Sequence, residues 1–354
     1  ILLVLAVAAA LRLWRIDSIP PGFHFDESFE GLEAWRILTE PSYRPIFLTG
    51  NFGVPPLNAY ANALMFGLFS LVGADVGPTA MRVTAAVFGM LGVASVYLLA
   101  LELRRLDGPD TRLSTAFALL AAAFLAVMRW HIHFSRMGIE PIIVPLIWAA
   151  STWLLLRGWR TGRWLPFIGC GVVLAAGMYT YQGAWIVPIL MAIVALLLLL
   201  DRRSKSADAK AEIPDETQPI FTLRSSILRL FVAAGVAALL VLPLLWFFVR
   251  NPDLLLLRPA QLVIVGETDS PADSGVWQNL LATAEMFGPF GNPGDLDPRR
   301  NLPGMSALNL WLIFPFYCGL CLTVRHLLRP AYAIPLIGLI GLLLPGVFSE
   351  YAPH

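Results

Sequence analysis

The sequence predicts an all-α integral membrane protein, a polytopic helical bundle with about nine transmembrane helices. Hydrophobic residues make up 57% of the 354 positions and charged residues only 14%, which is more apolar than ordinary soluble domains. The apolar residues gather in long runs without the alternation of a membrane β-strand, so helices are expected. Lysine and arginine concentrate in every second loop, as in chains that cross a bilayer repeatedly.

Nine apolar runs are candidate spans, because a helical span needs about 20 mostly apolar residues. The first run, 1–13, is shorter than this, so we expect upstream residues to be missing. The other eight runs cover residues 79–101, 113–130, 141–156, 165–181, 184–200, 230–249, 308–323 and 331–347.

The loop charges predict the orientation of the chain. Four loops together hold 14 lysine and arginine residues in 55 positions, and we assign them to the cytoplasm. The longest of them, 201–229, has mixed charge and is predicted to be a cytoplasmic linker. The long segments 14–78 and 250–307 then face outward. The four basic loops are 102–112, 157–164, 201–229 and 324–330.

One apolar stretch, 57–73, leaves this topology open to a second interpretation. If it crossed the bilayer, the preceding segment would move to the cytoplasm. It is short and carries Asn58, Tyr60 and Asn62, so we expect a helix that lies in the outer interface. The first outer loop, 14–78, therefore contains interfacial helices.

A pair of carboxylates, Asp26 and Glu27, lies in the first loop after the first apolar run. A charged group costs about 2.5 to 3.5 kcal/mol inside the bilayer, whereas just outside it the same group can act on a substrate held at the surface. The pair is therefore the leading candidate for catalysis. The alternative is that the acids cap the first helix of the loop.

Arginines near the predicted outer ends of spans are candidates for binding a lipid phosphate. Arg82 and Arg129 lie in such positions, as does Arg12, and Arg136 follows in the adjacent loop. Arginine matches phosphate with a planar fork of donors, so Arg82, Arg136 and Arg129 are the predicted donor-phosphate residues. The alternative is that these side chains extend to the interface as flanking arginines often do.

The order of these motifs between spans resembles the GT-C superfamily of membrane glycosyltransferases. The nearest branch is the one with the dolichyl-phosphate-mannose protein mannosyltransferases and the bacterial lipid A aminoarabinose transferases. The resemblance extends over most of the chain. The motifs are LRLWR at 11–15, PPG at 20–22, DE at 26–27, PPLNAY at 55–60, AMRV at 80–83, HFSR at 133–136, YTYQGA at 179–184 and DPRRN at 297–301.

This resemblance implies transfer of a sugar from a polyprenyl-phosphate carrier to an acceptor hydroxyl on the extracytoplasmic face, with inversion at the anomeric carbon. The catalytic acid of the family matches Asp26, which would act as general base with Glu27 in support. It also implies a single GT-C-like transmembrane domain over residues 1–354, with 14–78 as the catalytic loop. Because full members continue further, we expect a C-terminal part to be missing.

The remaining candidates concern sugar, acceptor and cofactors. Tyr179 and Tyr181 can stack on a sugar or belong to the interfacial aromatic belt, and His24 and Asn301 can bind sugar or acceptor hydroxyls. A metal site from His24 and the histidines at 131 and 133 fits no ligand spacing, so no metal or other cofactor is expected. The expected partners are a polyprenyl-phosphate sugar, a lipid, glycan or protein acceptor, and membrane lipids.

Two other functions share these features. A lipid-linked sugar flippase or another multispan transporter would have the same apolar chain and outer arginines, but it would not need the acidic pair. A non-catalytic subunit of a membrane glycosylation complex would tolerate loss of Asp26. Nucleic-acid binding is excluded, because the net charge is only +1 and no long basic surface is expected.

Overall fold

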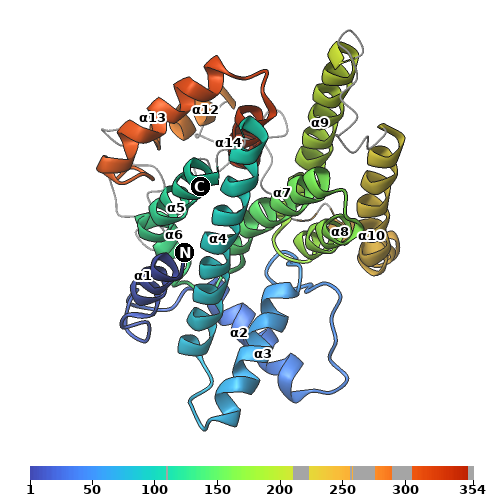
Figure 1. The fold of residues 1–354 in the computed structure, drawn as a ribbon. Coiled ribbons are helices and arrows are strands. Elements are labelled where there is room, and N and C mark those ends of the chain that lie inside the picture. Colours follow the sequence, from blue (N-terminus) through green and yellow to red (C-terminus); the bar gives the residue numbers. More distant parts are fainter. Residues whose placement is uncertain (109–110, 210–222, 256, 258–275, 289–304, 350–354) are drawn as a thin grey trace.

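The computed structural model describes residues 1–108, 111–209, 223–255, 257, 276–288 and 305–349, and the regular elements within these ranges are helices (Figure 1). The predicted all-α fold class is therefore confirmed. The α-helices are α1 (Leu2–Leu13), α2 (Phe25–Thr39), α3 (Leu57–Leu71), α4 (Pro78–Asp107), α5 (Thr111–Val127), α6 (Arg129–Phe134), α7 (Ile143–Thr161), α8 (Trp164–Met178), α9 (Val187–Ala209), α10 (Leu223–Arg250), α12 (Val276–Glu285), α13 (Leu310–Arg325) and α14 (Pro330–Val347). Two 3-10 helices, η1 (Glu140–Ile142) and η2 (Gln182–Ile186), precede α7 and α9.

Each of the nine predicted spans coincides with a helix. Within the described ranges, five helices are long and apolar enough to cross a membrane, namely α4, α7 with η1, α9 with η2, α10 and α14. The helices α1, α5, α8 and α13 have 12, 17, 15 and 16 residues, which is shorter than a full span. These five helices are candidate spans by length and composition, and they agree with a membrane protein, whereas the number of spans stays a prediction.

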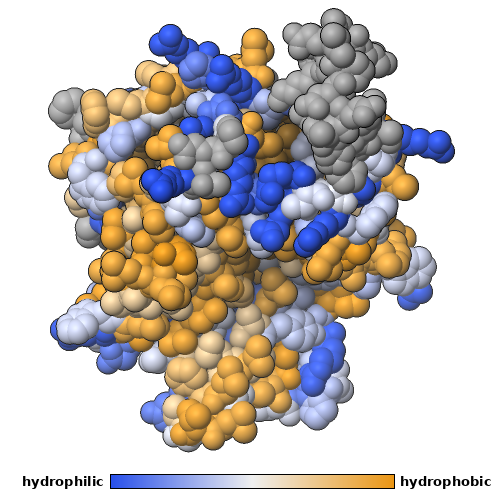
Figure 2. Space-filling model, viewed as in Figure 1, coloured by the Kyte–Doolittle hydropathy of each residue, from blue (hydrophilic) through white to orange (hydrophobic). Residues whose placement is uncertain are grey.

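The predicted cytoplasmic linker, 201–229, is partly helical. Helix α9 continues to Ala209, and α10 begins at Leu223 rather than near residue 230. Polar residues extend both helices because the helical hydrogen-bond pattern needs no apolar side chains once the first turns have formed. In Figure 2, hydrophobic residues cover much of the visible middle of the molecule, and hydrophilic residues gather toward the end at which α4 finishes.

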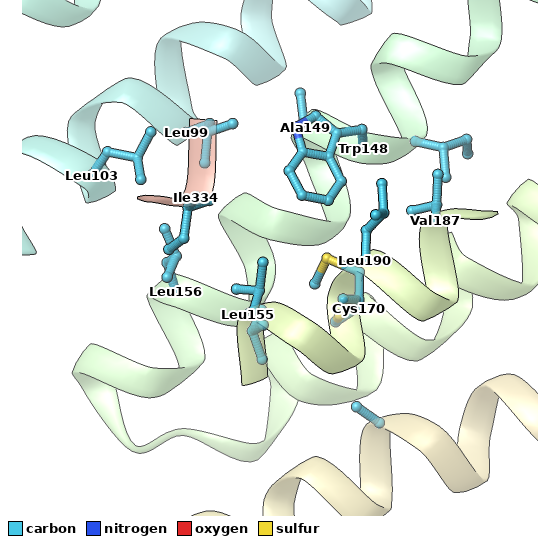
Figure 3. Packing of buried hydrophobic residues seen from close by; sticks show 14 of the residues in the cluster. Leu99, Leu103, Trp148, Ala149, Leu155, Leu156, Cys170, Val187, Leu190 and Ile334 are labelled. Carbon is cyan, nitrogen blue, oxygen red and sulfur yellow. The ribbon is translucent and has the colours of Figure 1, made fainter. Parts of the chain in front are cut away.

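The main core lies where α4, α7, α8, α9 and α14 meet (Figure 3). Trp148, Leu156 and Ile334 are buried there, together with Cys170. In a lipid bilayer the hydrophobic effect does not drive helices together. Helices associate there by close packing, which small residues allow. At Gly171 a Cβ atom would lie 2.4 Å from the backbone oxygen of Ala233, so α8 and α10 need a glycine at this contact.

A buried carboxylate joins α4 to α7. Glu102 is 1% exposed and accepts hydrogen bonds from Arg160, with Nε 2.6 Å from Oε2 and Nη2 2.8 Å from Oε1. Arg105 Nη1 lies 3.3 Å from the same Oε1. The two arginines more than balance the charge of the buried carboxylate, so this ion pair fixes the arginine-rich end of the bundle.

Helices α2 and α3 pack on each other at the end of the molecule where α4 begins (Figure 1). Their shared cluster includes Ala34 and Ile37 of α2 and Ala59 and Phe66 of α3. Helix α3 has 15 residues, about 22 Å of helix, which falls short of the roughly 30 Å of bilayer hydrocarbon. This packing agrees with the expected interfacial helix, and the sidedness stays a prediction.

Candidate active site

The acidic pair begins α2, and the two carboxylates have different structural positions. The backbone N–H of His24 donates to Glu27 Oε2 at 2.9 Å, and the backbone N–H of Asp26 donates to His24 Nδ1 at 3.2 Å. These two contacts form a capping box around the first turn of the helix. Helix capping by the acidic pair, which the sequence left as the alternative to catalysis, is thus present at Glu27.

Glu27 is buried and fully engaged with the protein. Its side chain is 2% exposed, and Oε1 accepts the backbone N–H of Gly138 at 2.7 Å. Arg82 Nε lies 3.8 Å from the same oxygen. A Cβ at Gly138 would lie 2.9 Å from the Cβ of Met81, so a side chain there would push the loop away from Glu27. Glu27 therefore holds the site together rather than facing a substrate.

Asp26 is the accessible carboxylate of the pair. Its side chain is 22% exposed, and its Oδ1 accepts a hydrogen bond from Asn51 Nδ2 at 2.8 Å. The sequence analysis did not identify Asn51. It has a left-handed backbone, φ 47°, as do Phe52 and Gly53 with φ 60° and 84°. Asparagine and glycine tolerate this conformation best, so the Asn-Phe-Gly sequence was the available signal for a tight turn against Asp26.

The ring of His24 lies against the same carboxylate. Nδ1 is 3.3 Å from Asp26 Oδ2 and also receives the backbone N–H of Asp26. A neutral ring accepts this N–H through Nδ1, whereas a protonated ring pairs with the carboxylate instead, because one nitrogen cannot do both. Nε2 is buried and has no hydrogen-bond partner among the described residues. His24 thus contacts Asp26, the predicted base.

One turn further along α2, Glu30 is buried at 1% exposure, and neither carboxylate oxygen has a hydrogen-bond partner in the described part of the chain. Burial raises the pKa of Glu30 well above 4.5, the nearby charges of Glu140, Asp26 and Glu33 raise it further, and only the approach of the Asn58 side chain opposes this shift. Ionising this carboxyl would place an unpaired charge in a site of low polarity. Glu30 is therefore held as the neutral acid, a role that the sequence analysis missed.

Arg82 donates hydrogen bonds to the loop that leads to Asp26. It is 2% exposed, and its guanidinium donates to the backbone oxygen of Gly22 at 2.6 Å and of Ile16 at 3.2 Å. Its Nη1 also lies 3.5 Å from the backbone oxygen of Asp17, and its Nε approaches Glu27. Arg82 therefore positions the first loop, and its contact with a donor phosphate stays a prediction.

Arg136 caps the end of α1 and the loop after it. It makes five hydrogen bonds of 2.6 to 3.2 Å to carbonyl oxygens, including those of Leu11 and Arg12 in the last turn of α1. Burial lowers the pKa of Arg136, with a smaller contribution from the nearby charge of Arg82. A guanidinium has five N–H donors, and these five bonds use all of them. Phosphate binding by Arg136 would therefore require one of the bonds to open, and it stays a prediction.

Arg12 points into the protein, not toward the interface. It is fully buried, donates to the carbonyl oxygen of Ala126 at 2.9 Å and lies 2.7 Å from His131 Nδ1. Burial and the charge of Arg12 lower the pKa of His131 to about 3, so this histidine is neutral and accepts the hydrogen bond. The described residues contain no group of three or more side chains that could hold a metal ion.

Arg129 has a different set of contacts from Arg82 and Arg136. Its Nη2 donates to the carbonyl oxygen of Ser306 at 2.7 Å, and its backbone N–H donates to Asn309 Oδ1 at 3.0 Å. The contacts thus connect α6 to the segment before α13, and phosphate binding by Arg129 stays a prediction. Asn301 lies outside the described residues.

The predicted aromatic residues lie where α8 ends and α9 begins. The backbone oxygen of Tyr179 accepts the N–H of Leu57 at 2.8 Å, and its hydroxyl donates to Leu240 O at 3.0 Å. Tyr181 follows, and its ring lies against Gly183, where a Cβ would be 2.8 Å from the ring. Tyr179 thus joins the first loop to the bundle, while sugar binding by either tyrosine stays a prediction.

An apolar cavity of about 610 Å³ lies between α8, α9 and α10. Met178 and Trp185 line it near the ends of helices that lead to the first loop. The same Trp185 packs against Phe248 with ring centroids 5.8 Å apart, and Phe248 packs against Phe47 of the loop at 5.0 Å. The loop that contains Phe47 and Asn51 therefore lies next to this cavity, and the same loop contacts Asp26 through Asn51. The remaining lining includes Leu174, Pro188, Ala192, Ala195, Ala234, Ala238 and Val241.

Comparisons with known proteins agree with the motifs. Residues 53–212 match the family model described as dolichyl-phosphate-mannose-protein mannosyltransferase. The fold is similar to the crystal structure of the Archaeoglobus fulgidus oligosaccharyltransferase tethered with an acceptor peptide, with a TM-score of 0.53 and 15% sequence identity. This match covers 99% of the present chain and 47% of that one, so the chain spans about half the length of the archaeal enzyme. No curated protein gives a significant match.

These two matches support the GT-C superfamily, which confirms the resemblance found in the motifs. The segment matched by the family model starts after Asp26 and Glu27, so the acidic pair is not part of that match. It includes Arg82, Arg136 and Tyr179. The assignment to a bacterial branch stays a prediction.

We predict that Glu27→Gln destabilises the protein, whereas Asp26→Asn at the next position does not. A glutamine keeps one acceptor oxygen, so either the His24 or the Gly138 N–H loses its partner, which costs about 1–3 kcal/mol. Asparagine at position 26 still accepts from Asn51. The thermal unfolding midpoint of the two variants in the same detergent measures the difference. Equal midpoints for Glu27→Gln and wild type would contradict the role of Glu27.

We predict that Glu30→Gln makes stability less sensitive to pH. Because the pKa of Glu30 is raised in the folded chain, the folded state keeps a proton that the unfolded chain loses as the pH rises past about 4.5. Wild type then loses up to about 1.4 kcal/mol per pH unit between that pH and the raised pKa, and the variant does not. Denaturant unfolding at several pH values measures this. Glu40→Gln, with an exposed side chain, is the control that should follow wild type.

Proposed function

We propose, from the GT-C fold of this chain, that it is a membrane glycosyltransferase that moves a sugar from a polyprenyl-phosphate carrier to an acceptor hydroxyl on the extracytoplasmic face, with Asp26 as general base. The observation that carries this proposal is the difference in burial and contacts between the two carboxylates of the acidic pair. Glu27 is buried in structural contacts, and Asp26 is 22% exposed with its oxygens oriented by Asn51 and His24. An oriented carboxylate open to a substrate is what a general base requires.

In the proposed reaction, the acceptor oxygen attacks the anomeric carbon of the sugar from the face opposite the phosphate. The new carbon–oxygen bond forms as the bond to the phosphate breaks, which inverts the anomeric configuration. Asp26 takes the acceptor proton, and the carrier phosphate leaves as an anion with the electron pair. An inverting step of this kind needs one base and no covalent intermediate on the protein, which matches an acidic pair in which Asp26 alone is accessible.

The apolar cavity between α8, α9 and α10 supports a lipid-linked donor. It lies within the membrane-spanning part of the bundle, and Trp185 connects it to Phe248 and Phe47 beside the first loop. A polyprenyl tail in this cavity would bring its phosphate toward the loop that carries Asn51. Arg82 and Arg136 hold the loop that precedes Asp26, so they contribute to the site by fixing its shape, in addition to any contact with phosphate.

We predict that Asp26→Asn lowers the rate of sugar transfer by about 100-fold to 10,000-fold, because the change removes the base with almost no change in volume. Asp17→Asn, in the same loop but exposed, is the matched control and should keep wild-type turnover. The assay compares transfer from a set of polyprenyl-phosphate sugars by the full-length protein. Retention of more than about a tenth of wild-type turnover in Asp26→Asn would overturn the assignment of the base.

The same assay separates the proposed enzyme from the two other candidate functions. A flippase would move lipid-linked sugar between leaflets of a vesicle without making the transferred product, and Asp26→Asn would leave that movement unchanged. A non-catalytic subunit would give no product by itself and would tolerate Asp26→Asn in the complex. Product formation that depends on Asp26 excludes both.

We predict that the first loop faces outward. A cysteine introduced by Asp17→Cys should react with a membrane-impermeant thiol reagent added outside intact cells, and one introduced by Ser206→Cys should react only after the membrane is opened. The distribution of arginine and lysine between alternate loops is the physical reason. Labelling at position 17 only from the cytoplasm would mean that α3 crosses the bilayer, and the site would then lie on the cytoplasmic face.

A further inference from the structure

A second apolar cavity lies at the opposite end of the bundle from Asp26. It has a volume of about 670 Å³ and is enclosed by α4, α5, α13 and α14. Leu103 and Asp107 contribute from the last turns of α4, and Tyr332 from the first turn of α14. This is the arginine-rich end, which the loop charges predict to be cytoplasmic. The cavity is therefore separate from the proposed catalytic site.

The cavity is apolar inside and open to the surface that faces lipid. Phe117 and Leu322 line it and are 49% and 53% exposed, respectively. Gly319 also lines it, and a Cβ atom at this position would meet no atom within 4 Å. The volume is in the range of about 300–1,000 Å³ typical of sites for small ligands. Its open side faces the bilayer, so the available apolar ligand is a lipid chain.

The polar rim of the cavity carries an excess of positive charge. Asp107 accepts from Arg104 Nη1 at 2.9 Å, from Arg329 Nη1 at 3.4 Å and from the Tyr332 hydroxyl at 3.2 Å. One carboxylate thus orients two guanidinium groups and leaves a net charge of about +1. The side chains of Arg329 and Arg104 are 63% and 28% exposed, so N–H groups that do not contact Asp107 face outward.

A second charged cluster lies nearby on the last turns of α4. Glu102 is paired there with both Arg105 and Arg160, and these three residues do not line the cavity. Basic pockets between membrane helices on the cytoplasmic side match the anionic headgroups of phospholipids. A guanidinium binds phosphate oxygens with paired N–H donors.

We propose that this cavity binds an anionic phospholipid, with an acyl chain between α4, α13 and α14 and the phosphate against Arg104 and Arg329. The two parts of the site fit two parts of one molecule. The apolar interior contacts hydrocarbon, and the rim contacts a phosphodiester at the depth where the headgroups of the leaflet lie. The bound lipid would join α13 and α14 to α4. The proposal does not depend on glycosyl transfer.

The experiment is native mass spectrometry of the purified protein with phosphatidylglycerol and phosphatidylcholine of the same acyl chains. Wild type should retain phosphatidylglycerol preferentially, with one molecule bound most tightly. Gly319→Leu places a side chain in the cavity from a position where a Cβ would meet no atom within 4 Å, and it should lower the retention of phosphatidylglycerol at least about tenfold. Arg329→Gln should lower it about fivefold and leave phosphatidylcholine unchanged, which corresponds to about 1 kcal/mol for one arginine near a membrane surface.

Gly235→Leu is the matched control, because Gly235 is also a helical glycine in α10 whose Cβ would meet no atom within 4 Å, and it does not line this cavity. It should bind lipid as wild type does. Equal retention by wild type and a folded Gly319→Leu, checked by circular dichroism, would overturn the proposal. Two other results would overturn it. One is that glycerol phosphate, which has no acyl chains, competes with phosphatidylglycerol for the site. The other is a dimer of wild type that Gly319→Leu dissociates, since a second copy of the chain would then fill the cavity.

Discussion

The end of the molecule where α4 begins depends on the carboxylate of Glu27. It accepts the backbone N–H groups of His24 and Gly138 and lies 3.8 Å from Arg82, so it connects the start of α2, the segment before η1 and helix α4. A buried carboxylate needs several donors, and here the chain supplies them from positions far apart in sequence. This arrangement sets the position of Asp26, the residue beside it, without using Asp26 itself.

The two ends of the bundle satisfy the N–H donors of arginine in different ways. At the end where α4 begins, Arg82 and Arg136 donate mainly to backbone carbonyls of the first loop and the end of α1. At the arginine-rich end, the partners are the carboxylates of Glu102 and Asp107. Carbonyls satisfy N–H donors without cancelling charge, so Arg82 and Arg136 keep a positive field around the loop that precedes Asp26. Such a field favours an anionic leaving group in the proposed reaction.

Unlike the buried Glu27 and Glu102, which lie next to arginines, Glu30 has no basic partner among the described residues. It has no hydrogen-bond partner in the described part of the chain and lies near Glu140 and Asp26, which raise its pKa in addition to burial. A neutral Glu30 adds no negative charge beside Asp26. Glu30 and Glu140 can therefore both lie close to the proposed base at a lower electrostatic cost. Like-charged groups near a functional carboxylate are a recurrent feature of catalytic sites.

The sequence by itself determined the helices, the membrane setting and the place of Asp26 and Glu27 in the first loop after α1. Length and hydropathy of each run are local properties, so they identify helices without knowledge of their neighbours. Only the tertiary structure decided that Glu27 is structural and Asp26 accessible, that Arg12 and Arg136 turn into the protein, and that Asn51 contacts Asp26. These outcomes depend on which distant segments pack around each side chain, and a polar residue's burial and partners are fixed by that packing rather than by its neighbours in sequence.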